Sequence, residues 1–464
     1  MSTFTQLHVS SIPLPKRPDL RALLTAIRGQ IAWIKNGEGF VAVGQAARID
    51  IPNMTNATPE ERFEQAARWW KNLVEQAEVD DAVHVPGSGL TTFGSFSFMP
   101  HSPAGSTLIV PEVIVGISEG VPFLTTITGA TEADGASQTD RAAPADGISP
   151  ADMAASASQR DAATYTKNVA VRKLRDALAN NPVFPDNTSK AETFYGDFGT
   201  VRVDAALSLN EYRAVVDNAR EQIAQGTVSK VVVARDLDIT TEKPIDERTL
   251  ITRLNAAYPD CWTFAVDGLI GATPELLASS DAGVVTSRVL AGTLPREAHT
   301  DPQTLVDSAK DQDEHAHAVD SVVEVLQGHG ETYADATPYV YELPNLFHLA
   351  SDVRTELDRE VNTFDVLGAL HPTAALGGTP RPKALEIIDR IERIDRDRYG
   401  APVGWMGADN TGQWCVSLRC ARIIDDFHAR AWAGGGIMHD SDADAEYAET
   451  MAKFAPILGA FGAN

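Results

Sequence analysis

Residues 431–454 read AWAGGGIMHDSDADAEYAETMAKF, and they combine two kinds of binding group. The first is a run of three glycines, Gly434, Gly435 and Gly436. Such a run lets the backbone approach a ligand and leaves N–H groups open to an anion. The second is a predicted helix that starts near Ser441 and Asp444, with Glu446 and Glu449 on one face. The stretch fits an anion pocket beside a metal-binding carboxylate pair, or a glycine turn before an acidic helix.

The composition describes a globular and strongly acidic chain. Of its 464 residues, 43% are hydrophobic and 22% are charged, which predicts a large buried core rather than disorder. The 39 Lys and Arg residues against 64 Asp and Glu residues give a net charge of −25. This charge argues against binding to nucleic acid or to an anionic membrane. An anionic substrate would therefore need cations or backbone N–H groups gathered at its site.

The three cysteines, Cys261, Cys415 and Cys420, form no CxxC pair. Neither a disulfide framework nor a zinc site is therefore expected. The N-terminus lacks a signal pattern, and no window approaches 18 consecutive apolar residues. We expect a cytoplasmic protein.

Helical and strand-like patterns alternate along the chain without an internal repeat or a clear linker. Helices are predicted at residues 19–34, 58–77, 165–180, 209–225, 246–257, 301–327 and 380–394. Strands are predicted at residues 39–51, 95–98, 106–115, 230–238, 261–266, 269–272, 275–279, 284–291, 403–406, 414–423 and 428–433. Residues 131–162, rich in Ala, Asp, Ser and Gly, are interpreted as a solvated, mobile insertion. The pattern predicts a single large α+β domain, residues 1–464, whose N-terminal part is 1–200.

Lys230 and Glu275 are candidates for acid–base chemistry. Lys230 opens the apolar strand KVVVARD. It is either a solvated strand end or a partly desolvated amine that acts as a general base. Glu275 lies in GATPELL between a Thr-Pro turn and two leucines. Burial there would raise the pKa of its carboxyl and suit a general acid, unless the side chain lies in water at a rim.

Glu314 lies in AKDQDEHAHAVD on the predicted long helix, a run that a solvated charged face also explains. His315 and His317 lack the i, i+4 spacing of a zinc-binding helix. Oxygen ligation by Glu314 together with Glu446 or Glu449 would favour Mg²⁺. Without a cation these glutamates would repel one another, and the pKa of at least one would rise.

Arg419 lies in CVSLRCARI, where alternation predicts a strand that places it on the face of Cys415 and Ser417. An arginine on a core face must meet an anion, either in a salt bridge or in a substrate carboxylate. Residues 371–378, HPTAALGG, contain too many special residues for a simple connecting loop.

Nine motifs occur in a fixed order: SKVVVAR, IGATPELL, SRVLAGTLPR, the Glu-His pair of the long helix, HPTAALGGTP, YGAPVGW, SLRCARI, AGGGI and EYAET. Together they resemble the chorismate-utilising enzymes, which include anthranilate, aminodeoxychorismate, salicylate and isochorismate synthases. The resemblance covers residues 206–459. The N-terminal motifs GSFSFMP and LIVPEVIVG are similar, more loosely, to the isochorismate synthase branch.

The resemblance implies an anthranilate-synthase-component-I-like fold. This is one large domain of two stacked, mostly antiparallel sheets flanked by helices, with the site in a cleft. It also implies that one carboxylate of chorismate binds Mg²⁺ held by Glu314 and Glu449, with Glu446 assisting. The other carboxylate would meet Arg419, Tyr399 and the N–H groups near Gly434, Gly435 and Gly436. Gly292 and Thr293 would line the ring pocket, and His348 would lie near the metal-bound end.

Individual positions indicate a branch of this family. Lys230 matches the base that activates water in the isochorismate and salicylate synthases. Ala291 stands where aminodeoxychorismate synthases carry a nucleophilic lysine, so the covalent route lacks its nucleophile. Ala375 matches a position that is alanine in isochorismate synthases and threonine in salicylate and anthranilate synthases. Gly435 departs from the commoner GAGI form.

The resemblance therefore implies a Mg²⁺-dependent isomerase that converts chorismate to isochorismate. Lys230 would take a proton from the water that attacks C2, and Glu275 would protonate the departing C4 hydroxyl. A salicylate synthase is the first alternative, and a non-catalytic chorismate-binding subunit is the second. A glutaminase subunit is not expected because water is the nucleophile. Isochorismate would feed menaquinone or siderophore biosynthesis.

Overall fold

The computed structural model describes residues 6–26, 29–54, 58–129, 196–296, 300–342, 346–358 and 361–463. The expected insertion at 131–162 and the expected helix at 165–180 lie outside these ranges. Among the described helices, none combines the length and the hydropathy needed to span a bilayer.

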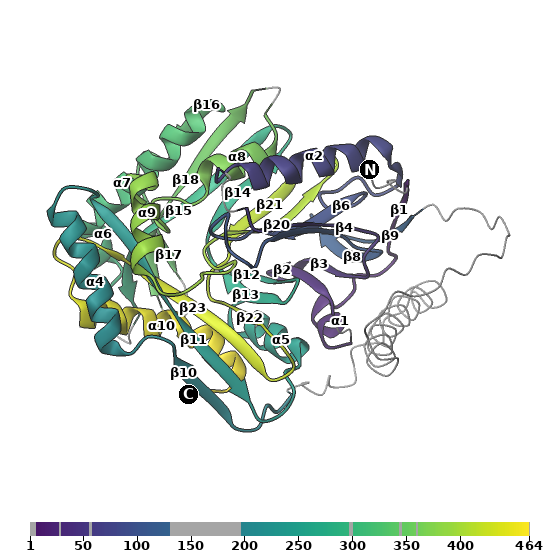
Figure 1. Ribbon diagram of the computed structural model, residues 1–464. Coiled ribbons are helices and arrows are strands. Elements are labelled where there is room, and N and C mark those ends of the chain that lie inside the picture. Colours follow the sequence, from purple (N-terminus) through teal and green to yellow (C-terminus); the bar gives the residue numbers. More distant parts are fainter. Residues whose placement is uncertain are drawn as a thin grey trace, which may run out of the picture.

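Two large sheets form the body of the described protein (Figure 1). The 13-stranded sheet runs in the order β10 (Val201–Ala205), β11 (Lys230–Thr241), β23 (His428–Ile437), β22 (Cys420–Ile423), β13 (Leu269–Thr273), β12 (Trp262–Val266), β2 (Ile31–Lys35), β3 (Glu38–Val43), β8 (Val113–Ser118), β9 (Val121–Gly129), β1 (Leu7–Pro13) and β5 (Glu78–Asp81), with β19 (Gly378–Thr379) also on β11. Within the described ranges only β1 and β5 pair in parallel here.

The 10-stranded sheet is antiparallel throughout its described pairs. It runs in the order β16 (Gly330–Ala334), β18 (Leu346–Leu357), β15 (Val284–Pro295), β14 (Leu276–Asp281), β21 (Gly412–Val416), β20 (Pro402–Gly407), β6 (Thr91–Ser95), β7 (Ser106–Val110) and β4 (Ala47–Ile51), with β17 (Tyr339–Glu342) also on β18. The expected architecture of two mostly antiparallel sheets is confirmed.

Helices cover the outer faces of the sheets. They are α1 (Leu20–Ala26), α2 (Glu61–Gln76), α4 (Leu209–Ala224), α5 (Glu247–Ala257), α6 (Gln303–Asp307), α7 (Ala309–Gln327), α8 (Thr363–Leu370), α9 (Arg381–Ile391) and α10 (Ala443–Phe461). Helix α10 packs on β23, and α4 and α9 pack on β11, whereas α7 packs on β15 and β18 (Figure 1). Polar caps start several helices; the Ser208 and Glu211 capping box, for example, begins α4.

An aromatic core joins the two sheets. Phe40 of β3 meets the ring of Trp405 on β20 at 4.9 Å and that of Phe93 on β6 at 6.0 Å, both edge to face. All three side chains are buried. Burial of a side chain such as Phe40 contributes about 1.5–3 kcal/mol, so this layer holds the sheets face to face.

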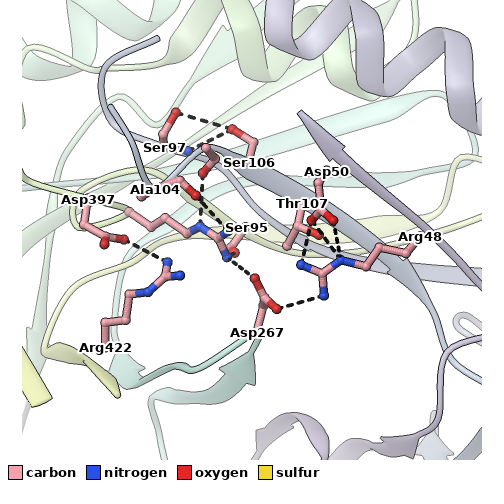
Figure 2. A network of polar contacts seen from close by, with 12 residues as sticks. Arg48, Asp50, Ser95, Ser97, Ala104, Ser106, Thr107, Asp267, Asp397 and Arg422 are labelled. Carbon is pink, nitrogen blue, oxygen red and sulfur yellow. Dashed lines mark hydrogen bonds and ion pairs between the residues drawn. The ribbon is translucent and has the colours of Figure 1, made fainter. Parts of the chain in front are cut away.

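A polar network also bridges the sheets (Figure 2). Arg48 of β4 forms ion pairs with Asp50 on its own strand and with Asp267 in the turn between β12 and β13, the latter at 2.9 Å. Arg398 donates to Asp267 at 3.0 Å and to Ser95 at 2.7 Å. The β12–β13 turn of one sheet is thereby fastened to β4 and β6 of the other.

The chain crosses between the sheets twice at one place. It leaves β13 of the 13-stranded sheet and enters β14 of the 10-stranded sheet through Pro274 and Glu275. It returns from β21 to β22 through residues 417–419. The two crossings bond to each other, because Val416 N donates to Glu275 O at 3.0 Å and Ala272 N donates to Arg419 O at 3.2 Å.

The predicted single strand at residues 414–423 is therefore wrong. Arg419 does not alternate with Cys415 and Ser417 on one strand face, because the backbone turns out of β21 and Arg419 adopts φ 47°. A non-glycine residue at positive φ is uncommon and often marks a functional site.

Three helix predictions also need correction. Residues 19–34 form α1 and then strand β2, with Gly29 between them at φ 66°. The helix predicted at 301–327 is divided into α6 and α7, because Ser308 is extended and caps α7 by accepting from Asp311 N. Asp442, rather than Ser441, caps α10.

Candidate active site

A pocket of about 130 Å³, open to solvent, lies where the crossings meet β11, β23 and the helices α7 and α10. Twelve of the thirteen predicted site residues line it: Lys230, Glu275, Gly292, Thr293, Glu314, Ala375, Tyr399, Arg419, Gly434, Gly435, Gly436 and Glu449. The thirteenth, Glu446, lies directly behind Gly435, since a Cβ on that glycine would be 2.7 Å from Glu446 Oε2. Residues far apart in the sequence are thus brought to one place.

The three glycines belong to strand β23 and not to a turn. Gly436, Gly435 and Gly434 pair with Val232, Val233 and Ala234 of β11. Strand β22 pairs with β23 at Ala429–Ala431, and farther along β23 the three glycines line the pocket. A Cβ on Gly436 would lie 2.6 Å from Lys230 Cε. The missing side chains therefore make room for Lys230 and Glu446.

Glu275 is held in the pocket wall by the first crossing. Its backbone N–H donates to Thr273 Oγ1 at 3.3 Å, and its carbonyl accepts from Val416. Burial raises the pKa of its carboxyl to about 7, although the charges of Arg419, Lys453 and Lys230 act in the opposite direction. The raised pKa fits the predicted general acid, because a proton remains available near neutral pH.

Lys230 forms an ion pair with Glu314, which was predicted to bind Mg²⁺. Its Nζ is 2.9 Å from Glu314 Oε1, and the lysine side chain is 15% exposed. Lys230 begins β11, where it pairs with Thr379 of β19, and Glu314 extends from α7. This ion pair occupies the amino group of Lys230, so Lys230 must release Glu314 before it can act as a base.

Arg419 supplies the guanidinium of the pocket. Burial lowers the pKa of its guanidinium, and nearby Tyr399, Cys261, Glu275 and Glu449 oppose the shift, so the side chain remains cationic at neutral pH. Burial also raises the pKa of Tyr399, which keeps its hydroxyl a hydrogen-bond donor. A partly buried cation beside a donor hydroxyl is suited to binding a carboxylate.

A comparison with models of protein families identifies the family of this chain. Residues 160–462 match the model of the chorismate binding enzymes. The chain belongs to the chorismate binding enzyme family. Its predicted family is thereby confirmed.

Curated relatives and solved structures place this chorismate binding enzyme near the isochorismate synthases. It is 26% identical over 444 residues to isochorismate synthase MenF of Bacillus subtilis, covering 91% of this chain and 85% of the relative. It is 35% identical over 266 residues to isochorismate synthase EntC of Escherichia coli K12, covering 54% and 67%. The fold matches E. coli MenF, the menaquinone-specific isochorismate synthase, with TM-score 0.73 at 22% identity, covering 98% of this chain and 95% of that one. It also matches anthranilate synthase component I of Streptococcus pneumoniae, with TM-score 0.63 at 17% identity, covering 93% and 92%.

The carboxylates predicted to hold Mg²⁺ each contact another group in this chorismate binding enzyme. Glu314 pairs with Lys230, as described above. Glu449 pairs with Lys453 at 2.6 Å, and Glu446 accepts a hydrogen bond from Ser441 at 2.8 Å. Across the described residues, no cluster of three or more His, Cys, Asp or Glu side chains is arranged to hold a metal. The predicted three-carboxylate cluster is therefore not formed in this arrangement.

The chemistry of these donors nevertheless suits a divalent cation. Burial raises the pKa of Glu446, the bond from Ser441 opposes the shift, and the charges of Glu449 and Glu314 raise it further. All three side chains offer only oxygen, the ligand that Mg²⁺ prefers. Because the charges of Glu449 and Glu314 both act on Glu446, a cation near these carboxylates would relieve their repulsion.

Lys453 and His348 also line the pocket. Lys453 was missed from the sequence, although it follows Glu449 by one helical turn and so shares its face. It also donates to Gly434 O at 2.8 Å. His348 was expected near the metal-bound end; its Nδ1 is 3.0 Å from Thr293 Oγ1, and burial lowers its pKa to about 3. His348 is therefore neutral at physiological pH.

Proposed function

We propose that this chorismate binding enzyme is an isochorismate synthase, an isomerase that converts chorismate to isochorismate. The similarity to isochorismate synthases of B. subtilis and E. coli supports this assignment. Water adds at C2, the C4 hydroxyl leaves as water and the double bonds shift, so the reaction is redox-neutral. It needs no nicotinamide and no glutaminase subunit, and its product would feed menaquinone or siderophore biosynthesis.

The observation that carries the proposal is the pairing of a protonated acid with a lysine in one pocket. Glu275 keeps a proton to about pH 7, and Lys230 is close enough for its charge to act on that carboxyl. Lys230 would accept a proton from the attacking water after releasing Glu314. Glu275 would donate its proton to the departing C4 hydroxyl.

The charges of the pocket suit a dicarboxylate. Arg419, Lys453 and Lys230 provide three cations, against the carboxylates of Glu314 and Glu449. Arg419 and Tyr399 would bind one substrate carboxylate, assisted by the backbone of β23. Gly292 at φ 76° and Thr293 would line the ring, and Ala375 would leave space beside it.

Glu314, Glu449 and Glu446 would hold Mg²⁺ at the other end of the pocket. When bound, the ion supplies positive charge to the second substrate carboxylate and fixes the orientation of the ring. Glu314 would then serve the cation instead of Lys230, which leaves the lysine available as a base.

Product analysis tests the proposal directly. Purified protein is incubated with chorismate and Mg²⁺ near neutral pH, and the products are separated and identified. Isochorismate should be the major product. Salicylate and pyruvate in its place would identify a salicylate synthase, and unchanged chorismate would identify a non-catalytic binding protein. Full activity in excess EDTA would contradict the role of Mg²⁺.

A further inference from the structure

One edge of strand β11 has a gap in its strand pairing next to the pocket. On this edge β19 pairs with Lys230 and Val231, and β10 pairs from Leu237 onward, while β23 occupies the opposite edge. Unpaired backbone groups inside a protein are costly, so the groups in the gap need other partners. Val232 N donates to Gly377 O at 2.9 Å, and two buried charged side chains bond to Val232 O and Ala234 N.

Glu392 and Arg396 take the place of a strand in this gap. Ala234 N donates to Glu392 Oε1 at 2.7 Å, and Arg396 Nη2 donates to Val232 O at 2.8 Å. The two side chains also pair with each other, with Arg396 Nε 2.8 Å from Glu392 Oε2, and both are at most 3% exposed. The ion pair therefore continues the hydrogen bonding of β11 beyond the end of β19.

The same arginine reaches the loop that forms the adjacent pocket wall. Arg396 Nη1 donates to Leu376 O at 2.9 Å, and its guanidinium stacks on Phe98 at 4.3 Å. Leu376 and Ala375 line the pocket, as does Val232. One side chain thus bonds to both walls, the strand that begins with Lys230 and the loop that carries Ala375.

We propose that Arg396, oriented by Glu392, is a positioning residue that fixes the spacing between Lys230 and the Ala375–Leu376 wall. The proposal rests on the proposed function, since it concerns the alignment of the substrate ring with the base. A planar guanidinium with several donors can bond to the strand, the loop and the glutamate at once. A lysine at this position retains the charge but cannot make all of these bonds.

The two residues that follow Arg396 in the sequence bond to groups outside the pocket. Asp397 pairs with Arg422 at 3.1 Å, and Arg398 donates to Ser95 and Asp267 in the network between the sheets (Figure 2). That network also contains Arg48, whose ion pairs with Asp50 and Asp267 involve no pocket-lining residue. Arg48→Lys is therefore a matched control for the loss of a multidentate arginine.

The test compares Arg396→Lys, Glu392→Gln and Arg48→Lys with the wild type. Steady-state kinetics with chorismate and Mg²⁺ are measured at a temperature where circular dichroism shows each variant folded. Hydrogen exchange is followed in peptides that cover residues 371–378 and 230–236. Because small misplacements of reacting groups are costly, kcat should fall about 10- to 100-fold in Arg396→Lys while KM changes less than about threefold.

Exchange should become faster in both peptides of Arg396→Lys and stay unchanged in Arg48→Lys, whose kcat should equal the wild-type value. If Arg396→Lys does not fold, Glu392→Gln provides the same test, because it retains an acceptor for Ala234 but loses the charge that orients Arg396. Wild-type kcat and wild-type exchange in the folded variants would overturn the proposal. A wild-type protein that leaves chorismate unchanged would instead refute the proposed function, and the exchange data would still test the positioning role.

Discussion

Replacement of Glu275 by glutamine should stabilise the protein at alkaline pH. Burial raises the pKa of this carboxyl from 4.5 to about 7 in the folded state. Between these values the folded protein keeps a proton that the unfolded chain has released. The free energy of unfolding therefore falls as the pH rises through this window, and the loss is complete above it. At 1.36 kcal/mol per pKa unit, the loss amounts to about 3 kcal/mol.

Glutamine has nearly the same shape and no ionisable proton, so the variant escapes this loss. Thermal denaturation of the wild type and Glu275→Gln is measured at pH 5 and at pH 8.5. For a chain of this length, 1 kcal/mol corresponds to about 1 °C. The difference in melting temperature between variant and wild type should therefore grow by about 2–3 °C from pH 5 to pH 8.5.

Glu221→Gln on the exposed surface of α4 is the control, and its difference from the wild type should not change with pH in this way. In the activity assay, Glu275→Gln should lose about 10²- to 10⁴-fold in kcat, the usual contribution of a positioned acid. A melting difference for Glu275→Gln that is the same at both pH values would show that this carboxyl is ionised in the folded protein, and the reasoning would be refuted.

Four further results are expected. The kcat of the wild type should fall as the pH rises above about 7, because Glu275 must be protonated to act; a rate that still increases to pH 9 would contradict this. Lys230→Ala should remain folded by circular dichroism but lose about 10²- to 10⁴-fold in kcat, and near-normal turnover would remove it from the role of base. Arg419→Ala should raise KM for chorismate about 10- to 100-fold in steady-state assays, whereas an unchanged KM would exclude a bond to the substrate carboxylate. Glu449→Ala should weaken Mg²⁺ binding in calorimetric titrations of the substrate-free protein, and wild-type affinity would place the ion elsewhere.

Local patterns identified the strands and helices where one periodicity dominates. The apolar run of β11 and the capped helix α4 are examples, and both lie close to their predicted ranges. Residues 19–34 show the limit, because a short apolar run fits either a helix or a buried strand until its neighbours are known. β2 becomes a strand because β3 and β12 hydrogen-bond to both of its edges.

The residues of the candidate site were predicted more fully than their contacts. Lys230 and Glu314 lie 84 positions apart, so their ion pair depends on how β11 and α7 pack and not on any local pattern. The crossing between the sheets at Arg419 was also not predicted, because positive φ is uncommon for arginine and nothing in the sequence indicates it here. Lys453 is different, since its spacing from Glu449 was visible on the predicted helix.

The double crossing between the sheets has a mechanical consequence. Glu275 and Arg419 lie on two segments that are bonded to each other and that each connect one sheet to the other. A small sliding motion of one sheet over the other would carry this acid and this arginine as a unit. Lys230 belongs to β11 and would follow the 13-stranded sheet alone. Such a motion would thus change the separation of base and acid without changing the spacing between the acid and Arg419.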